Sequence, residues 1–433
     1  MKRRMTMLVL LLLSVPLAAS AQSGGVRFER GVSWQEAQAM AGAANKYLFV
    51  LVCALGSRSC QAVDSVFAQD RVGAAVNEKF IAVKIRGDTS QVIPGDARDL
   101  YIDAPELRQY GITTFPTFLF FAPGGNLVHR AAGGRNVDGF LALAADALDP
   151  AKQYYVQLDR YERGAKDYGV MVYLARTARA LGDTGVARRV ARDYIDHLSP
   201  SDRYTSDNIR FIGRFTERSS DPGFAIFVQH SDTIDRSVGI TGYAHSIADR
   251  VITAEEINPL VFPGGKPTPT VPDWTAIGAA ITRKYGLTYA ERTVLNAQIR
   301  RAYALENWTE LTGYTVRKLE RYGSSLDSDE INALTWDLFL YSDDQHALTK
   351  AITWMEPVAK GVEQNPATSG FFGSAYIDTY ANLLYKVGRT DEAITWEEKA
   401  VQLSPPGSFL WEAHNTVLAK MKRGEPTWPH ESE

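Results

Sequence analysis

Cysteine is almost absent from this chain of 433 residues, which contains only Cys53 and Cys60. Two cysteines can form at most one disulfide within the chain, so its stability must come mainly from burial of apolar side chains. The seven histidines are scattered, and none has a second histidine or cysteine at metal-ligand spacing. We therefore predict no metal site and no other cofactor. The sequence also lacks a phosphate-binding glycine-rich loop and a Gly-x-Ser-x-Gly motif, which leaves no support for the enzyme classes that use them.

The chain has no excess of charge of one sign, with 47 basic and 50 acidic residues. Non-specific nucleic-acid binding needs a concentrated basic face, so this balance argues against a nucleic-acid partner. No run beyond the N-terminus is long and apolar enough to span a membrane. A protein or an extended peptide is the partner that remains.

Residues 1–21 have the features of a secretory signal peptide: three basic residues at 2–4, an apolar run over 7–18, and small residues at 19–21. We expect the mature protein to begin near Gln22. Loss of the three basic residues changes the net charge from −3 to −6. The sequence therefore predicts a soluble exported protein, either periplasmic or secreted, with a bacterial periplasm suiting the leader best.

Residues 22–150 alternate between patterns typical of strands and of helices, which predicts one compact α/β domain. The run YLFVLVCAL is apolar throughout, as in a central strand that is buried on both faces. The predicted strands are VRFE, YLFVLVCAL, FIAVKI, FPTFLFF and NLVHRAA, and the predicted helices are WQEAQAMAGAANK, residues 58–79, PELRQYG and VDGFLALAADAL.

Residues 151–433 lose the strand pattern and show apolar residues three and four apart, which predicts an all-α region. The segment PLVFPGGKPTPTVPDW, residues 259–274, interrupts this periodicity and divides the region into two possible lobes. Besides two repeated stretches near its ends, the region has the following predicted helices: 204–218, 221–236, 246–257, 273–285, 290–305, 307–322, 328–340 and 345–362.

The order of elements over residues 26–150, together with the segment YGITTFPTFLFF, resembles the thioredoxin family. The resemblance implies a cis peptide bond between Phe115 and Pro116. It also implies that the backbone beside this bond contacts an extended polypeptide substrate. The polar segment DTSQVIPGDARDL, residues 88–100, is then either a lid over this surface or, more simply, a surface insertion.

The redox motif of that family, W-C-x-x-C, is degenerate here. Counting from the strand, Cys60 occupies the position of the second cysteine, and Ser57 replaces the first, attacking cysteine. Leu51 stands where the family often has a buried carboxylate. A serine hydroxyl stays protonated near neutral pH, whereas exchange requires a thiolate. A dithiol cycle through positions 57 and 60 is therefore excluded.

Three interpretations of CALGSRSC remain. Cys53 and Cys60 are two small buried apolar side chains, or they form a disulfide across the strand–helix corner, or Cys60 is a lone reactive thiol. The first is the simplest. The sequence cannot decide between them, because a disulfide depends on the distance between the two Cα atoms and on the directions of the Cβ atoms.

Two stretches of the helical region, MVYLARTARALGDTGVARRVARDYIDHLSP and YIDTYANLLYKVGRTDEAITWEEKAVQLSP, share one form: a helix, a Gly-containing turn and a second helix that ends in Ser-Pro. They resemble the tetratricopeptide repeat, whose small and proline positions match Ala381, Ala393, Ala400 and Pro405 in the second stretch. The resemblance implies stacked helix pairs that present a binding face.

Two functions follow from these observations. The first is an exported thioredoxin-fold protein that has lost dithiol exchange and binds protein or peptide as a chaperone-like module. The second is a periplasmic thiol-disulfide oxidoreductase that uses Cys53 and Cys60. We favour the first, because Ser57 stands in the place of the attacking sulfur.

Overall fold

The computed structural model describes residues 24–54, 56–87, 101, 104–366 and 372–429. The predicted leader and the polar segment at 88–100 lie outside these residues. The chain divides into two compact units, Met1–His197 and Leu198–Glu433. The first unit therefore contains the predicted α/β domain and, in addition, the helices that directly follow residue 150.

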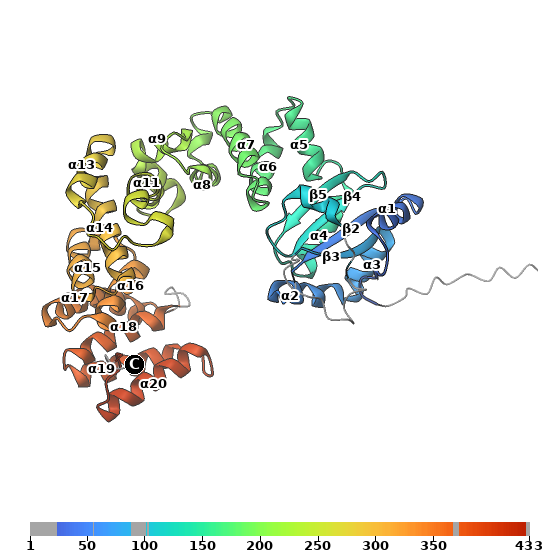
Figure 1. The fold of residues 1–433 in the computed structure, drawn as a ribbon. Helices are drawn as coiled ribbons and strands as arrows, with labels where there is room; N and C mark the ends of the chain where they lie inside the picture. Colours follow the sequence, from blue (N-terminus) through green and yellow to red (C-terminus); the bar gives the residue numbers. More distant parts are fainter. Residues whose placement is uncertain (1–23, 55, 88–100, 102–103, 367–371, 430–433) are drawn as a thin grey trace, which may run out of the picture. The chain divides into compact units, whose positions relative to one another are not determined.

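A five-stranded sheet forms the centre of the first unit (Figure 1). Its strands are β1 (Phe28–Glu29), β2 (Tyr47–Cys53), β3 (Phe80–Arg86), β4 (Thr117–Phe121) and β5 (Leu127–Ala132). They lie in the order β1-β3-β2-β4-β5. The first three pair in parallel, and β4 pairs antiparallel with both β2 and β5. All five predicted strands are confirmed.

The predicted helices of the first unit are present with one correction, and α5 is an additional helix that the sequence analysis did not predict. The helix predicted over 58–79 is two helices, because Gln69 has extended backbone (φ −76°, ψ 132°) and caps the second of them. The helices are α1 (Trp34–Ala43), α2 (Arg58–Phe67), α3 (Asp70–Lys79), the 3₁₀ helix η2 (Pro105–Tyr110), α4 (Val137–Leu148), α5 (Tyr154–Glu162), α6 (Tyr168–Ala180) and α7 (Thr184–His197).

Strand β2 is buried on both of its faces, which explains its continuous apolar sequence. Phe49, Leu51 and Cys53 pack in one core with side chains of α2, α3 and α4. The alternate residues Leu48, Val50 and Val52 pack in a second core with α1. Successive side chains of a strand point to opposite faces, so this register directs Cys53 towards α2.

His129 of β5 joins the sheet to the helices that follow it. The backbone N–H of Tyr154, the first residue of α5, donates a hydrogen bond to His129 Nδ1 (3.1 Å). Burial lowers the pKa of His129 to about 4, and Asp146 opposes this effect only in part. The imidazole is therefore neutral at neutral pH, with Nδ1 available as the acceptor.

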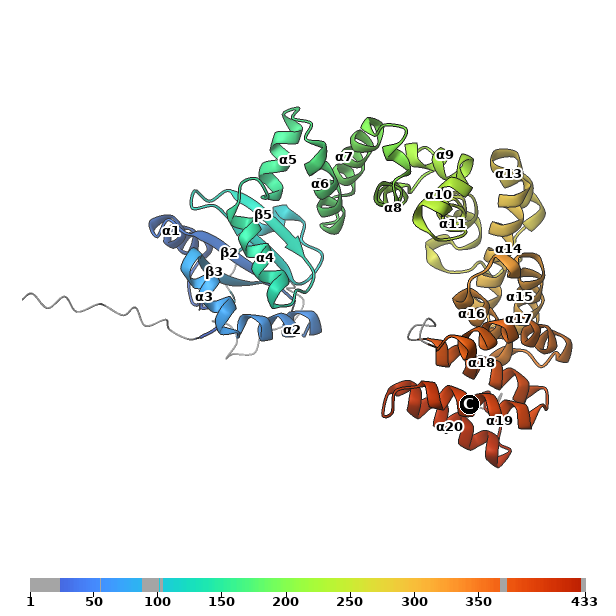
Figure 2. The same ribbon diagram turned by 180° about the vertical axis from the view of Figure 1, so that it is seen from behind.

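The second unit is helical throughout its described part, and contacting helices such as α13 and α14 or α18 and α19 lie side by side (Figure 2). None of the described helices combines the length and the apolar character needed to cross a bilayer. The helices are η3 (Asp202–Tyr204), α8 (Ser206–Phe215), α9 (Pro222–Gln229), α10 (Ser231–Val238), α11 (Tyr243–Ile252), the π-helix η4 (Thr253–Ile257), α12 (Asn258–Val261), η5 (Pro263–Gly265), α13 (Trp274–Tyr285), α14 (Leu287–Ala304), α15 (Trp308–Tyr322), η6 (Gly323–Ser325), α16 (Ser328–Tyr341), α17 (Gln345–Gln364), α18 (Gly373–Lys386), α19 (Thr390–Leu403) and α20 (Phe409–Arg423).

The predicted helices of this unit are present, but the one predicted over 221–236 is split at His230 into α9 and α10. His230 leaves the helical region of backbone space (φ −127°, ψ 31°). The predicted break at 259–274 contains the short elements α12 and η5 and then non-helical chain. Arg301 of α14 donates to the carbonyls of Thr268, Pro269 and Thr270 and so fastens this segment. The role of residues 259–274 as a boundary between two lobes stays a prediction.

Helices α18 and α19 form the hairpin predicted near the C-terminus. Ala381, Ala393 and Ala400 are fully buried in the same core, at positions where small side chains allow close helix approach. Gly388 has a positive φ (85°) in the turn between the two helices. These features agree with the predicted helix pair, and its membership of the tetratricopeptide repeat family stays a prediction.

We predict that the first unit loses stability as the pH falls from about 6.5 to about 4. The pKa of His129 is lower in the folded chain than in the unfolded chain, so acid protonates the unfolded state first. The loss amounts to about 3.5 kcal/mol at most, at roughly 1.4 kcal/mol per pKa unit. Urea unfolding at several pH values would measure it.

The variant His129→Asn keeps an acceptor for the Tyr154 N–H but cannot titrate, so the part of the pH dependence due to His129 should vanish. His346→Asn, at an exposed position, is the matched control and should retain the wild-type profile. An unchanged profile in His129→Asn would contradict this assignment.

Candidate functional site

The end of β2 and the start of α2 form the corner that the sequence analysis singled out. Cys53, the last residue of β2, and Cys60, in the first turn of α2, are joined by a disulfide, and their Cα atoms are 5.9 Å apart. This separation lies within the usual range for a disulfide. The structure therefore has the disulfide, the second of the three interpretations of CALGSRSC. The simplest interpretation, two unbonded buried side chains, is wrong, and so is a lone reactive Cys60 thiol.

Both cysteines of this disulfide are buried, with 4% of Cys53 and 6% of Cys60 exposed. They belong to the core between the sheet and α2, α3 and α4. The backbone around them is also fixed, because Gly87, just after β3, donates its N–H to the carbonyl of Cys53 (2.8 Å). The two sulfur atoms are therefore buried below the surface of the domain.

Ser57 lies nearer the surface than either cysteine and is the N-cap residue of α2. Its Oγ accepts a hydrogen bond from the N–H of Cys60 (3.4 Å) and lies 2.9 Å from Ser59 Oγ. Gly56 before it has a positive φ (74°), which suits glycine and allows the sharp entry into the helix. A hydroxyl oxygen thus stands at the positive end of α2.

The segment before β4 contacts this corner. Ser59 Oγ donates to the carbonyl of Phe115 (3.3 Å). The peptide bond between Phe115 and Pro116 is cis, as the resemblance implied. The N–H of Gly133 donates to the carbonyl of Pro116 (2.9 Å), and the hydroxyl of Thr117 donates to the carbonyl of Thr114 (2.7 Å).

The structure therefore brings together every residue that the sequence analysis proposed for the site: Cys53, Cys60, Ser57, Phe115 and Pro116. The ring of Phe115 packs against the core that contains both cysteines. It also closes over Gly87, where an added Cβ would lie only 2.0 Å from Phe115 Cε1.

Sequence reasoning missed two residues of this corner, Ser59 and Gly87. Ser59 stands at an exposed position and forms a hydrogen bond to a residue 56 positions away, which no local pattern reveals. Gly87 directly follows the apolar run of β3, and a glycine at a strand end is the one signal that could have indicated close packing.

Two arginines flank the corner: Arg58 is the first residue of α2, and Arg86 is the partner of Cys53 in the β2–β3 register. Leu51, at the position where the family often has a carboxylate, is fully buried. Its partner in the β2–β3 register is Lys84, which pairs with Asp64 of α2 (2.5 Å). Burial, and then Asp64, raise the pKa of Tyr101, so this phenol stays neutral. The described side chains here supply no buried acid or base for proton transfer.

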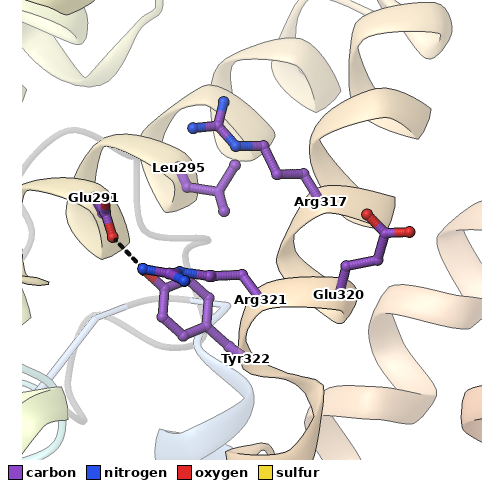
Figure 3. A pocket seen from close by; sticks show the side chains of 6 residues that line it. All are labelled: Glu291, Leu295, Arg317, Glu320, Arg321 and Tyr322. Atoms are coloured by element: carbon purple, nitrogen blue, oxygen red, sulfur yellow. Dashed lines mark hydrogen bonds and ion pairs between the residues drawn. The ribbon is translucent and has the colours of Figure 1, made fainter.

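A surface pocket of about 260 Å³ lies in the second unit, between α14 and α15. Figure 3 shows Glu291 and Arg321 paired across it (3.1 Å), with Tyr322 beside them. Arg317 and Glu320 also line the pocket, and Glu320 forms an ion pair with Lys350 (3.1 Å). Since acids and bases balance, the pocket has no clear preference for a ligand of one charge.

Among the described residues, one group of side chains has the composition and spacing of a metal site. It consists of Asp378, Glu397 and His414, all buried in the second unit. The sequence analysis predicted no metal site because it considered only ligands that are close together in the sequence.

Comparison with known proteins agrees with the class of fold seen in the sheet. Residues 34–148 match the family model of the thioredoxin-like domain. This part of the chain is therefore a thioredoxin-like domain, and a largely helical region follows it. Among solved structures, a similar chain is "DsbH Oxidoreductase", with 16% sequence identity and a TM-score of 0.24 over 32% of this chain and 93% of that chain. No curated protein matches the chain.

We predict that the Cys53–Cys60 disulfide stabilises the first unit by about 2–3 kcal/mol, the magnitude expected for a short closed loop. The double variant Cys53→Ala/Cys60→Ala should lower the free energy of unfolding by this amount in urea titrations. As a direct check, protein unfolded without reductant should take up no alkylating agent, and protein reduced first should take up two equivalents. Two alkylated thiols before reduction would contradict the disulfide.

Proposed function

We propose that this chain is an exported binding protein whose thioredoxin-like domain recognises extended polypeptide and does not perform dithiol exchange. The observation that supports this most directly is the position of the two sulfur atoms. They are joined to each other and buried, while Ser57 occupies the more exposed place at the start of α2.

Disulfide exchange begins when a thiolate attacks a sulfur atom, so it needs an accessible sulfur. In the thioredoxin family that sulfur belongs to the first cysteine of the motif, and the resemblance aligns Ser57 with it. Ser57 Oγ instead caps the helix. The disulfide is then a structural bridge that fixes the strand–helix corner.

The binding surface in this proposal is the segment Gly111–Phe115, which leads into β4. Gly111, Thr113 and Thr114 are exposed, while Ile112 and Phe115 are half-buried against the domain. An extended chain can pair with an exposed backbone segment of this kind by main-chain hydrogen bonds, and such pairing gives affinity without strong sequence preference. The hydrogen bond from Ser59 to Phe115 holds this surface against α2.

A second candidate function is a thiol-disulfide oxidoreductase that uses Cys53 and Cys60 directly. The observation in its favour is the disulfide itself, which lies at the strand–helix corner where the family places its redox chemistry. This function requires a partner thiolate to reach a sulfur that is at most 6% exposed. The burial of both cysteines makes it the weaker candidate.

Export fits both functions. The predicted leader directs the chain to an oxidising compartment, and a disulfide persists in such a compartment. We propose the periplasm as its location.

We predict that the purified protein does not accelerate the reduction of insulin by dithiothreitol beyond the rate of the Cys53→Ala/Cys60→Ala variant. The double variant Ser57→Cys/Cys53→Ala restores a C-x-x-C motif in the same fold and should give a clear increase in rate. This variant shows that the assay can detect activity in this domain. Wild-type activity that disappears in Cys60→Ser would establish the oxidoreductase instead.

We further predict that the protein binds an unfolded polypeptide without free thiols, such as alkylated insulin B chain, in a fluorescence anisotropy titration. Thr113→Pro removes one exposed backbone N–H and should weaken binding several-fold if the peptide pairs with this segment. Thr113→Ala is the matched control, because it changes the side chain and keeps the N–H. Equal affinities of the two variants would show that the peptide binds elsewhere.

A further inference from the structure

Glu397 of α19 is an acid buried without a hydrogen-bond donor. Its side chain is fully buried, and neither carboxyl oxygen accepts a hydrogen bond from a described residue. Removing an ionised carboxylate from water without a partner costs several kcal/mol. The position therefore requires either a proton or a cation.

Two more ligand-type side chains lie against Glu397. His414 of α20 places Nδ1 3.7 Å from Glu397 Oε1 and 3.4 Å from Asp378 Oδ1 of α18. One ligand atom from each of the three residues lies within 4.8 Å of those of the other two. Three helices thus direct one polar group each to a common point inside an apolar core.

These separations match the geometry of a bound metal ion. A tetrahedral ion with bonds of about 2.0–2.1 Å holds its ligand atoms roughly 3.4 Å apart. The separations of His414 Nδ1 from the two carboxylate oxygens, 3.4 and 3.7 Å, are close to this value. Two carboxylates also cancel the charge of a divalent cation, so the complete site would be neutral, as burial requires.

Neighbouring side chains orient the ligands. The Asn382 side-chain amide donates to Asp378 Oδ1 (3.0 Å). Nε2 of His414 lies 3.4 Å from Ser374 Oγ. A histidine that binds a metal through one nitrogen needs an acceptor for the N–H on the other, and Ser374 supplies it for ligation through Nδ1.

We propose that Asp378, Glu397 and His414 bind a divalent transition-metal ion of the zinc type, which fastens α18, α19 and α20 together. An imidazole nitrogen in the set favours such an ion over Mg²⁺ or Ca²⁺, which prefer oxygen ligands alone. Because the site is buried, the role of the ion is structural. The three ligand residues are at most 9% exposed, so the fourth position of a tetrahedral ion is filled by the second oxygen of a carboxylate or by an enclosed water.

The competing state is a protonated carboxyl. Burial, and then the neighbouring Asp378, raise the pKa of Glu397 to about 10, so without a cation this group keeps its proton at neutral pH. The experiment must therefore separate bound metal from bound proton.

The test uses the full chain after chelator treatment and dialysis. Isothermal titration with Zn²⁺, metal analysis after desalting, and thermal unfolding are measured together. We expect one Zn²⁺ per chain and, at a concentration about 100-fold above the dissociation constant, a rise of roughly 5–10 °C in the unfolding temperature of the second unit.

Glu397→Gln keeps the shape of the side chain and removes one ligand, so the bound Zn²⁺ and the thermal shift should both be lost. Glu398→Gln, at the next position but exposed to solvent, is the matched control and should behave as wild type. Circular dichroism is used to check that each variant is folded. If Glu397→Gln does not fold, Asp378→Asn is measured in its place.

Two outcomes would overturn the proposal. The first is that the wild type does not bind Zn²⁺, or that Glu397→Gln binds it as tightly as the wild type. The second is tighter binding of Mg²⁺ or Ca²⁺ than of Zn²⁺, since the donor set would then not govern the site.

Discussion

Burial of strand β2 on both faces is the constraint on which the corner at residues 53–60 depends. The strand is held between β3 and β4, so its side chains must alternate between the core shared with α1 and the core shared with α2, α3 and α4. A slip of one residue would exchange the two faces. Cys53 would then point towards α1, and its sulfur could not reach Cys60. The register of the sheet therefore fixes the disulfide before any chemistry of the cysteines is considered.

The same register decides what the corner can do. It places the sulfur atoms inside the core and leaves Ser57 at the start of α2, while Ser59 connects that helix to Phe115. For the proposed peptide binding, a rigid corner next to an exposed backbone segment has the advantage that few groups need to be ordered when a peptide docks. Dithiol exchange begins at an accessible sulfur, and the two cysteines here are only 4% and 6% exposed.

The sequence contained enough information for the sheet and for the approximate site, because both follow from local patterns. Continuous apolar runs marked β2 and β4, and the segment before β4 indicated Pro116. The break between α2 and α3 was missed because Ala68 and Gln69 are compatible with a helix. The segment that contacts the end of α2, Gly25 and Val26, lies about 40 residues earlier in the chain. The disulfide stayed undecided because it depends on a Cα separation that only the folded corner defines. The Asp378–Glu397–His414 group was missed for a related reason: its members lie 19 and 17 residues apart, and the helix packing alone brings them together.

Other acids in the second unit show why this group differs from an ordinary buried polar contact. Asp249 is paired with Arg292, which donates to both of its oxygens. Asp221 accepts hydrogen bonds from the backbone N–H groups of Glu217 and Arg218, both at 2.8 Å. Glu397 has no such donor among the described residues, although it is more deeply buried than either. Replacing a buried polar group by an apolar side chain of similar volume is often neutral or stabilising, so packing gives no reason for an acid here. The proposed ligand role gives a physical reason for an acid whose buried neighbours are a second acid and a histidine.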